Sequence, residues 1–74
     1  MRQEIYYEDS VDVYCTDTEK TVNADIIDFK PNNILVVAIQ RSIKLILKYD
    51  PAFNQFVGNM SGLEFTAKAP KRII

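Results

Sequence analysis

Two polar segments carry most of the side chains that could do chemistry, and the chemistry they suit is hydrogen bonding to nucleic acid. They are Lys30-Pro31-Asn32-Asn33 and Gly58-Asn59-Met60-Ser61-Gly62. Asn side chains and loop amides can read the edges of unpaired RNA bases, lysines contact phosphates, and aromatic rings stack on bases. For the Asn residues the alternative role is turn formation. For the nearby aromatic residues it is core packing: Tyr14, Phe29, Tyr49, Phe53 and Phe56.

Catalytic chemistry fits this sequence poorly. It contains no histidine, so a general base would have to be a carboxylate or a lysine. Asp25 and Asp28 lie three residues apart in a predicted strand and should point to opposite faces, which prevents a carboxylate dyad. Cys15 is the only cysteine and has no activating base nearby in the sequence, so we expect a buried structural thiol. We predict no enzymatic activity, no cofactor and no metal site.

A predicted β-hairpin over residues 21–39 positions the first polar segment. Its first strand alternates between two faces, one with Val22, Ala24, Ile26 and Asp28, the other with Asn23, Asp25, Ile27 and Phe29. Pro31 fixes its own φ and Asn tolerates a left-handed backbone, so residues 30–33 form the turn. The second strand, Ile34–Ile39, is apolar on both faces. One face can line a small barrel, and we expect a neighbouring molecule to cover the other.

Four further extended segments complete the predicted fold. They are residues 11–16, 42–49, 53–57 and 63–67, and the segment 58–62 between the last two is predicted as a turn. Five to six short strands joined by tight turns predict an all-β fold, a small and strongly bent antiparallel barrel. We divide the chain into an N-terminal segment at 1–10, a barrel at 11–69 and a basic tail at 70–74. The N-terminal segment should form one or two helical turns or remain loose.

Length and composition predict a protein that assembles. With 74 residues the chain is near the lower limit for a domain that folds alone. A single cysteine and no histidine leave oligomerisation as the remaining means of adding stability. No apolar run is long enough to span a membrane, and no signal peptide is recognisable. We therefore expect a soluble, cytoplasmic protein.

The charges are unevenly distributed along the chain. Residues 1–28 carry eight acids and two bases, a net charge of −6, whereas residues 29–74 carry seven bases and two acids, a net charge of +5. Two interpretations stay open. The charges belong to solvated faces, or one face of the fold is basic and meets a polyanion.

At its two polar segments the sequence resembles the Sm-like family, which includes the Sm, LSm and Hfq proteins. Ala24, Ile26, Phe29 and then Asn32 or Asn33 before an aliphatic strand look like the first motif of the family. Phe56-Val57-Gly58-Asn59 looks similar to the second, with residues 63–65 as the closing strand. The chain differs from the second motif at Val57, where the family has Arg or Lys. Charge would then come from Lys30, Arg41 or Lys71-Arg72.

The resemblance implies a homo-oligomeric ring that binds single-stranded RNA. The brevity and composition of the chain suggest a phage or another compact microbial genome. The implied RNA-binding residues are Phe29, Lys30, Asn32, Asn33, Gly58 and Asn59. The residues expected at the interface between subunits are Leu35, Val37, Ile39, Phe56, Leu63 and Phe65. The alternative function is a structural or adaptor module that oligomerises without binding nucleic acid.

Overall fold

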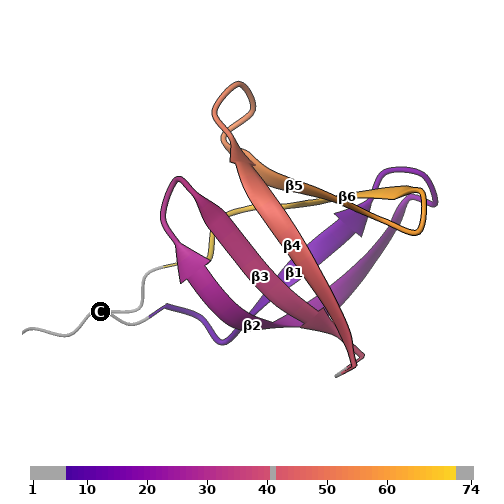
Figure 1. Ribbon diagram of the computed structural model, residues 1–74, viewed down its shortest axis with the longest axis horizontal. Coiled ribbons are helices and arrows are strands. Elements are labelled where there is room, and N and C mark those ends of the chain that lie inside the picture. The colour runs from indigo at the N-terminus through magenta and orange to yellow at the C-terminus, as the bar shows by residue number, and fades with distance from the viewer. Residues whose placement is uncertain (1–6, 41, 72–74) are drawn as a thin grey trace, which may run out of the picture.

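The described chain folds into one closed barrel of six antiparallel strands (Figure 1). The computed structural model describes residues 7–40 and 42–71. Each strand pairs with the next in the sequence, and the last returns to the first. The prediction of an all-β fold forming a small antiparallel barrel is confirmed. The strands are β1 (Ser10–Cys15), β2 (Lys20–Lys30), β3 (Ile34–Ile39), β4 (Ile43–Asp50), β5 (Gln55–Met60) and β6 (Leu63–Ala67).

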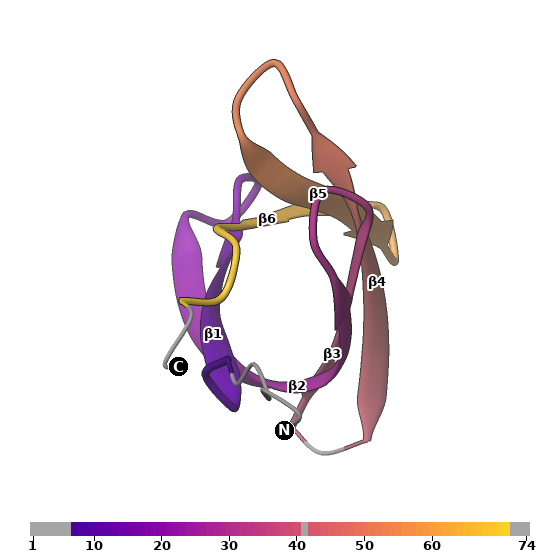
Figure 2. The ribbon, with the colours of Figure 1, turned by 90° about the vertical axis from the view of Figure 1, so that its left-hand side faces the viewer.

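Closure depends on the pairing of β6 with the end of β1. Val13, Tyr14 and Cys15 pair with Ala67, Thr66 and Phe65 in turn. The backbone N–H of Thr16 continues this ladder by donating to the carbonyl of Glu64 over 3.0 Å. Figure 2 shows β6 crossing to β1 and closing the ring of strands. Most of the strand edges are thereby paired, which is how small β-proteins limit edge-to-edge aggregation.

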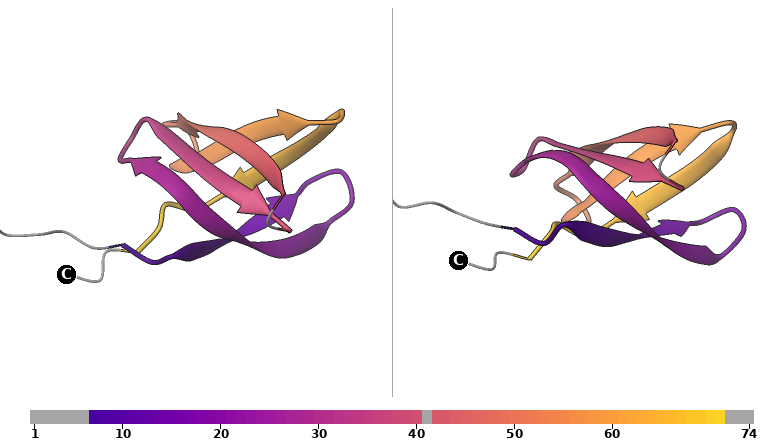
Figure 3. Two further views of the ribbon diagram at one scale, coloured as in Figure 1. Left: turned by 60° about the horizontal axis from the view of Figure 1, so that its bottom comes forward. Right: turned by 90° about the horizontal axis from the view of Figure 1, so that it is seen from below.

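β2 is shared between two pairings, and a β-bulge marks the change in its register. Its first half pairs with β1 and its second half with β3, and Figure 3 shows how the strand bends between them. Ile26 opposes Val37, but the next paired residue, Asp28, opposes Val36. Ile27 is therefore the extra residue of the bulge. The strict alternation predicted from the sequence is wrong beyond Ile26.

The bulge has a clear physical consequence. Unbroken alternation would place Asp28 on the same side as buried Ala24 and would turn Phe29 outward. The register shift instead leaves Asp28 exposed and brings Phe29 opposite Leu35 at the core. The carboxylate of Asp28 also accepts a hydrogen bond of 2.9 Å from the backbone N–H of Phe29. An unpaired carboxylate in the core would cost several kcal/mol, on the order of the penalties for burying charge.

The core is filled by the inward-facing residues of all six strands. The ring of Phe29 packs edge-on against Tyr7 at 4.9 Å and against Phe56 at 5.8 Å between centroids. Tyr49 also contacts Phe56, with 5.4 Å between ring centroids. Every buried residue of the core cluster is apolar: Val11, Val13, Cys15, Ala24, Leu35, Val37, Ile39, Leu45, Leu47, Phe56, Phe65 and Ala67.

The connections between strands are tight turns that contain residues with a left-handed backbone conformation. In the β2–β3 turn Asn32 has φ of 57°, and the N–H of Asn33 donates to the carbonyl of Lys30 over 3.0 Å. Pro at the second position and a positive φ at the third are typical of a type II turn. The predicted turn at residues 30–33 is confirmed. The predicted turn at 58–62 is too long, because Met60 pairs with Leu63 and only Ser61 and Gly62 form the turn.

Gly58 lies within β5 because no side chain fits there. A Cβ atom on this residue would lie 2.5 Å from the carbonyl oxygen of Ile46 and 2.8 Å from Leu47 Cδ2. Real Cβ atoms do not approach backbone oxygen that closely. The glycine therefore permits β5 to pass close to β4. Its role in this chain is to allow that packing.

The two ends of the described chain are hydrogen-bonded to each other. The N–H of Lys71 donates to Glu8 Oε1 over 2.8 Å, and the N–H of Glu8 donates to the carbonyl of Lys71 over 3.1 Å. Lys71, the second residue of the basic tail predicted at 70–74, is therefore hydrogen-bonded, and residues 72–74 lie outside the described part. The helical turns suggested for residues 1–10 are not formed at residues 7–10, and residues 1–6 lie outside the described part.

Replacing Gly58 with Ala should destabilise the protein by about 1–3 kcal/mol, the usual cost of overpacking a tightly packed site. Urea unfolding followed by circular dichroism measures it. The matched control is Asn59→Ala on the same strand, where the side chain is exposed and the change should stay within about 0.5 kcal/mol. Equal effects of the two substitutions would show that the β4–β5 packing does not require glycine.

Candidate functional site

The most distinctive surface of the protein is the outward side of β2, β3 and β4, which we call the outer face. Figure 1 shows β3 lying between the second half of β2 and β4. The outward side chains fall in three rows across these strands, set by the strand register. The first row is Asp25, Ala38 and Lys44; the second is Ile27 with Asp28, Val36 and Ile46; the third is Lys30, Ile34 and Lys48.

The middle of the outer face is apolar and uncovered. Ile27 is 52% exposed and Ile46 is 51% exposed, and they lie on either side of the half-buried Val36. Ile34 and Ala38 extend the apolar strip along β3 and are also half-buried. Contiguous apolar side chains that are rimmed by charge are typical of a binding surface.

The edges of the outer face carry opposite charges. Asp25 and Asp28 lie on β2 and are exposed, while Lys44 and Lys48 lie on β4 and are exposed. The uneven charge distribution of the sequence thus becomes an acidic strand and a basic strand separated by β3. Lys30, at the end of β2, is the one described base among the β2 members of the face.

Three of the predicted RNA-binding residues do come together. Lys30, Asn32 and Asn33 are exposed at the β2–β3 turn. The backbone carbonyl of Asn33 accepts a hydrogen bond of 2.9 Å from the N–H of Tyr49, which fixes the turn beside the end of β4. Lys48 lies in the same row as Lys30, so this end of the outer face combines two lysines with two Asn side chains.

The other three predicted RNA-binding residues do not join them. The ring of Phe29 is half-buried and packs against Tyr7, Phe56 and the core, so it belongs to the interior of the barrel. Gly58 is buried within β5. Asn59 is exposed but pairs with Glu64 in the β5–β6 hairpin, whose tip lies far across the barrel from the β2–β3 turn in Figure 1. The pocket expected between the two polar segments is not assembled within one chain.

The side chains expected at a subunit interface are mostly in the core. Leu63 is half-buried, and the remaining five are buried and face the interior: Leu35, Val37, Ile39, Phe56 and Phe65. The prediction is wrong for these five, because alternate residues of a strand point to opposite faces and these belong to the inner set. The surface available for contact on β3 is provided by Ile34, Val36 and Ala38.

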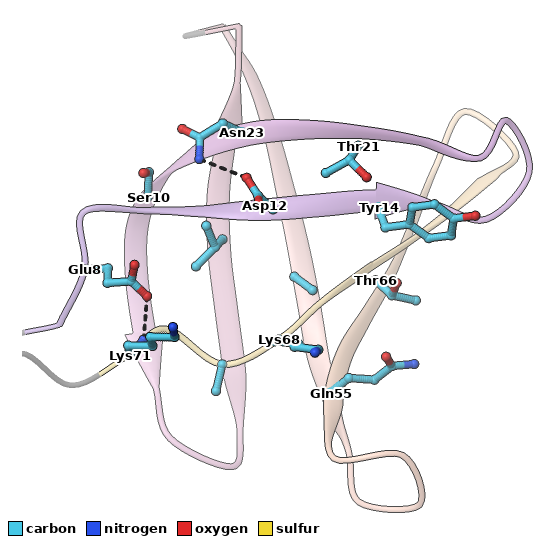
Figure 4. A pocket seen from close by; sticks show the side chains of 13 residues that line it. Glu8, Ser10, Asp12, Tyr14, Thr21, Asn23, Gln55, Thr66, Lys68 and Lys71 are labelled. Atoms are coloured by element: carbon cyan, nitrogen blue, oxygen red, sulfur yellow. Dashed lines mark hydrogen bonds between the residues drawn. The ribbon is translucent and has the colours of Figure 1, made fainter.

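A polar groove of about 590 Å³ lies beside the open part of β1, between β2, β6 and the segment leading to Lys71. Figure 4 shows its side chains, including acidic and basic groups along the same groove. Asn23 Nδ2 donates to Asp12 Oδ1 over 3.3 Å, and Glu8 accepts from the N–H of Lys71. The described acids of the groove are thus engaged in holding the barrel and its ends together.

Cys15 lies at the end of β1, where its side chain is 5% exposed. The hydroxyl of Thr18 donates a hydrogen bond to the thiol and lowers its pKa. The backbone amides of Thr18 and Asp17 lower it further, while burial and the carboxylate of Asp17 act in the opposite direction. The thiol is buried as predicted, but the turn that follows β1 also stabilises its thiolate form.

The exposed apolar residues were only partly recognisable in the sequence. The alternation of β4 places Ile46 between Lys44 and Lys48, and this much is readable from the period of two. Ile27 was assigned to a face with Phe29, and nothing in the local sequence marks the bulge that separates them. Phe53 was predicted to start a strand, but it lies in the β4–β5 turn and is 74% exposed.

Comparisons with models of known protein families, with curated proteins and with solved structures give no match for this chain. Within residues 7–40 and 42–71, no group of three or more acidic, His or Cys side chains is arranged to hold a metal ion. The same part of the chain contains no helix long and apolar enough to cross a membrane. The outer face is therefore the feature of the described chain from which a function can be inferred.

Replacing Thr18 with Val should raise the pKa of the Cys15 thiol, because it removes the hydrogen bond that lowers this pKa most. A spectroscopic titration of the thiolate measures the change. Thr16→Val is the matched control, since the Thr16 hydroxyl bonds to Glu64 Oε1 over 3.1 Å. The lowered pKa stabilises the fold above the pKa of the unfolded chain, and this contribution is lost as pH falls through the folded-state pKa. An unchanged titration in Thr18→Val would contradict the assignment.

Proposed function

We propose that the protein is a homo-oligomeric structural or adaptor module of the cytoplasm, and that its function is to bind other protein surfaces, first of all copies of itself. The observation that carries this proposal is the uncovered apolar centre of the outer face between an acidic and a basic strand. No catalytic step is part of the proposal.

The energetic argument is simple. Ile27 and Ile46 each leave about half of their side-chain surface in water. Burying the remainder of one such side chain is worth about 1 kcal/mol, roughly half of what full burial of an isoleucine provides. Val36 and Ile34 between them add to this surface. A small domain gains stability by covering such a face with a second protein.

A ring like those of the Sm-like family is one form that the assembly can take. β4 pairs with β3 from Ile43 to Lys48, but it pairs with β5 only from Lys48 to Asp50. Gly58 of β5 also packs against Ile46 and Leu47, so within the described chain the stretch from Ile43 to Leu45 has a neighbouring strand on one side only. Such an edge supports strand pairing between subunits, and the proposal includes this arrangement beside contact through the outer face.

We expect the wild-type protein to assemble reversibly, and Ile46→Lys to weaken that assembly by placing a charge in the apolar centre. Sedimentation velocity over a range of concentrations measures both. The matched control is Phe53→Lys, which adds the same charge at an apolar residue that is even more exposed but lies in the β4–β5 turn. A wild-type protein that stays monomeric at about 1 mM, where even weak complexes form, would refute the proposed function.

A second candidate function is weak binding of single-stranded RNA at the β2–β3 turn. The observation that favours it is the grouping of Lys30, Lys48, Asn32 and Asn33 at one end of the outer face. Lysines supply the contacts to phosphate, and the Asn side chains can hydrogen-bond base edges. The acids of β2 confine such a ligand to this end, because they repel phosphate along the rest of that strand.

If RNA binds there, Asn32→Gly combined with Asn33→Ala should weaken binding by about 1–3 kcal/mol, the range for good base-edge contacts. Glycine is used at Asn32 because it preserves the positive φ of the turn. Fluorescence anisotropy with short oligo-uridine and oligo-adenosine at two salt concentrations measures binding and its salt dependence. The control is Asn59→Ala, outside this end of the face. Absence of binding at low salt would leave the assembly function alone.

A further inference from the structure

The charge pattern of the outer face restricts which partner can cover it. Its acidic and basic strands lie on opposite sides of β3, and Asp25 and Lys44 occupy the same row with Ala38 between them. Neighbouring strands are about 4.8 Å apart, so these two residues lie roughly 10 Å apart across the sheet. A partner must therefore present a base to β2 and an acid to β4. A second copy of the same face has this pattern.

Symmetry then decides how two copies can meet. In a face-to-face pair whose strands stay aligned, a two-fold axis runs either close to parallel to β3 or close to perpendicular to it. An axis across the strands lays β2 over β2 and the first row over the third. It pairs Asp25 with Lys30, but it also places Asp28 against Asp28 at the apolar centre and each Lys44 against Lys48. An axis parallel to β3 lays β2 of one copy over β4 of the other. The second arrangement places Asp25 opposite Lys44 of the second copy, twice in the dimer.

The parallel axis also matches the apolar centres. The row of Ile27, Val36 and Ile46 is laid over itself in reverse order, so Ile27 meets Ile46 of the second copy and Val36 meets Val36. Asp28 lies in this row, between the rows that hold Lys44 and Lys48 of the second copy. Both exposed acids of β2 are then close to lysines. The aligned packing of two sheets, at about −30°, is a common way to build such a contact.

From these observations we propose that the outer face binds a second copy of the chain through a two-fold axis parallel to β3, with Asp25 paired to Lys44 of the other copy. The inference rests on the proposed function, since it names the arrangement of a self-assembly. It places the contact on the sheet surface and leaves the edge of β4 free. A nucleic acid cannot take this place, because Asp25 and Asp28 repel its phosphates.

One like-charged pair remains in this arrangement. Lys30 lies in the third row and faces Lys48 of the second copy. Both are exposed and lie at the end of the face, next to the β2–β3 turn. Long lysine side chains keep their charged ends in water by extending along an apolar surface, so this pair weakens the dimer less than a buried pair would.

The size of the face sets the expected strength. Three strands and three rows span roughly 15 by 20 Å, so each copy buries on the order of 300–500 Å². That is at the lower end of known protein interfaces, below the standard value of about 800 Å² per partner. The dimer should therefore be weak and its population should depend on concentration. The loss of affinity on removing the Asp25–Lys44 contact from each half should be easy to measure.

The test uses two single variants that are incompatible with themselves and compatible with each other. In Asp25→Lys, a lysine faces Lys44; in Lys44→Asp, Asp25 faces an aspartate. Each variant alone should dimerise at least about tenfold more weakly than the wild type, a change of about 1.4 kcal/mol. An equimolar mixture should regain the wild-type affinity as a one-to-one heterodimer, because both of its contacts then join opposite charges. Sedimentation velocity and native mass spectrometry measure affinity and composition.

The controls make the same charge changes elsewhere. Glu19→Lys lies in the β1–β2 turn and Lys68→Asp lies after β6, and both residues are exposed outside the outer face. Neither should alter dimerisation, and their mixture should gain nothing. If the wild type assembles but the Asp25 and Lys44 variants do not rescue each other, this arrangement is overturned and the proposed function stands. If the wild type is monomeric at every concentration, both fail.

Discussion

The structure depends on a constraint of β-strands, in which successive side chains point to opposite faces. β3 is apolar throughout, so closing the barrel buries only half of its side chains. The inward set of Leu35, Val37 and Ile39 forms the centre of the core. The outward set has no segment of the described chain over it. A barrel of this size buries one face of its central strand and leaves the other face exposed.

The bulge at Ile27 connects this constraint to the surface chemistry. By adding one residue, β2 turns Phe29 into the core and turns Asp28 out to the rim of the outer face. The same residue that corrects the register adds its own exposed side chain to the apolar centre. Lysines on β4 then complete a surface with opposite charges on its two sides. One register shift thus sets both the packing inside the barrel and the arrangement of side chains on the outer face.

The sequence was enough to predict the fold class because most strands follow the period of two. The bounds of β3 and β6 match the predicted segments, and the β2–β3 turn follows from Pro31 and Asn32. The predictions from the sequence are wrong where a local pattern is compatible with two structures. Gly58 was predicted to be a turn residue, but it is required by the close approach of Ile46. That contact is made between β4 and β5 and cannot be read from the local sequence around Gly58.

The candidate site was harder to predict than the fold for the same reason. Which residues of β3 point outward depends on the register of three strands, and the residues chosen from the sequence for the interface belonged to the inner set. The proposed RNA pocket assumed that two polar segments converge, but Asn59 belongs to the β5–β6 hairpin, whose tip lies across the barrel from the β2–β3 turn (Figure 1). The arrangement of acids on β2 and lysines on β4 could be recognised only once the structure placed these strands on either side of β3.

The central claim is that the outer face is the surface through which this protein meets a partner, and amide chemical shifts measured by NMR at two concentrations test it most directly. Spectra at about 10 µM and about 1 mM bracket the range expected for a weak complex. The account predicts concentration-dependent shifts that cluster at Asp25, Ile27, Val36, Lys44 and Ile46, with the β1–β2 turn unchanged. Identical spectra at both concentrations, or shifts confined to surfaces away from β2, β3 and β4, would contradict it.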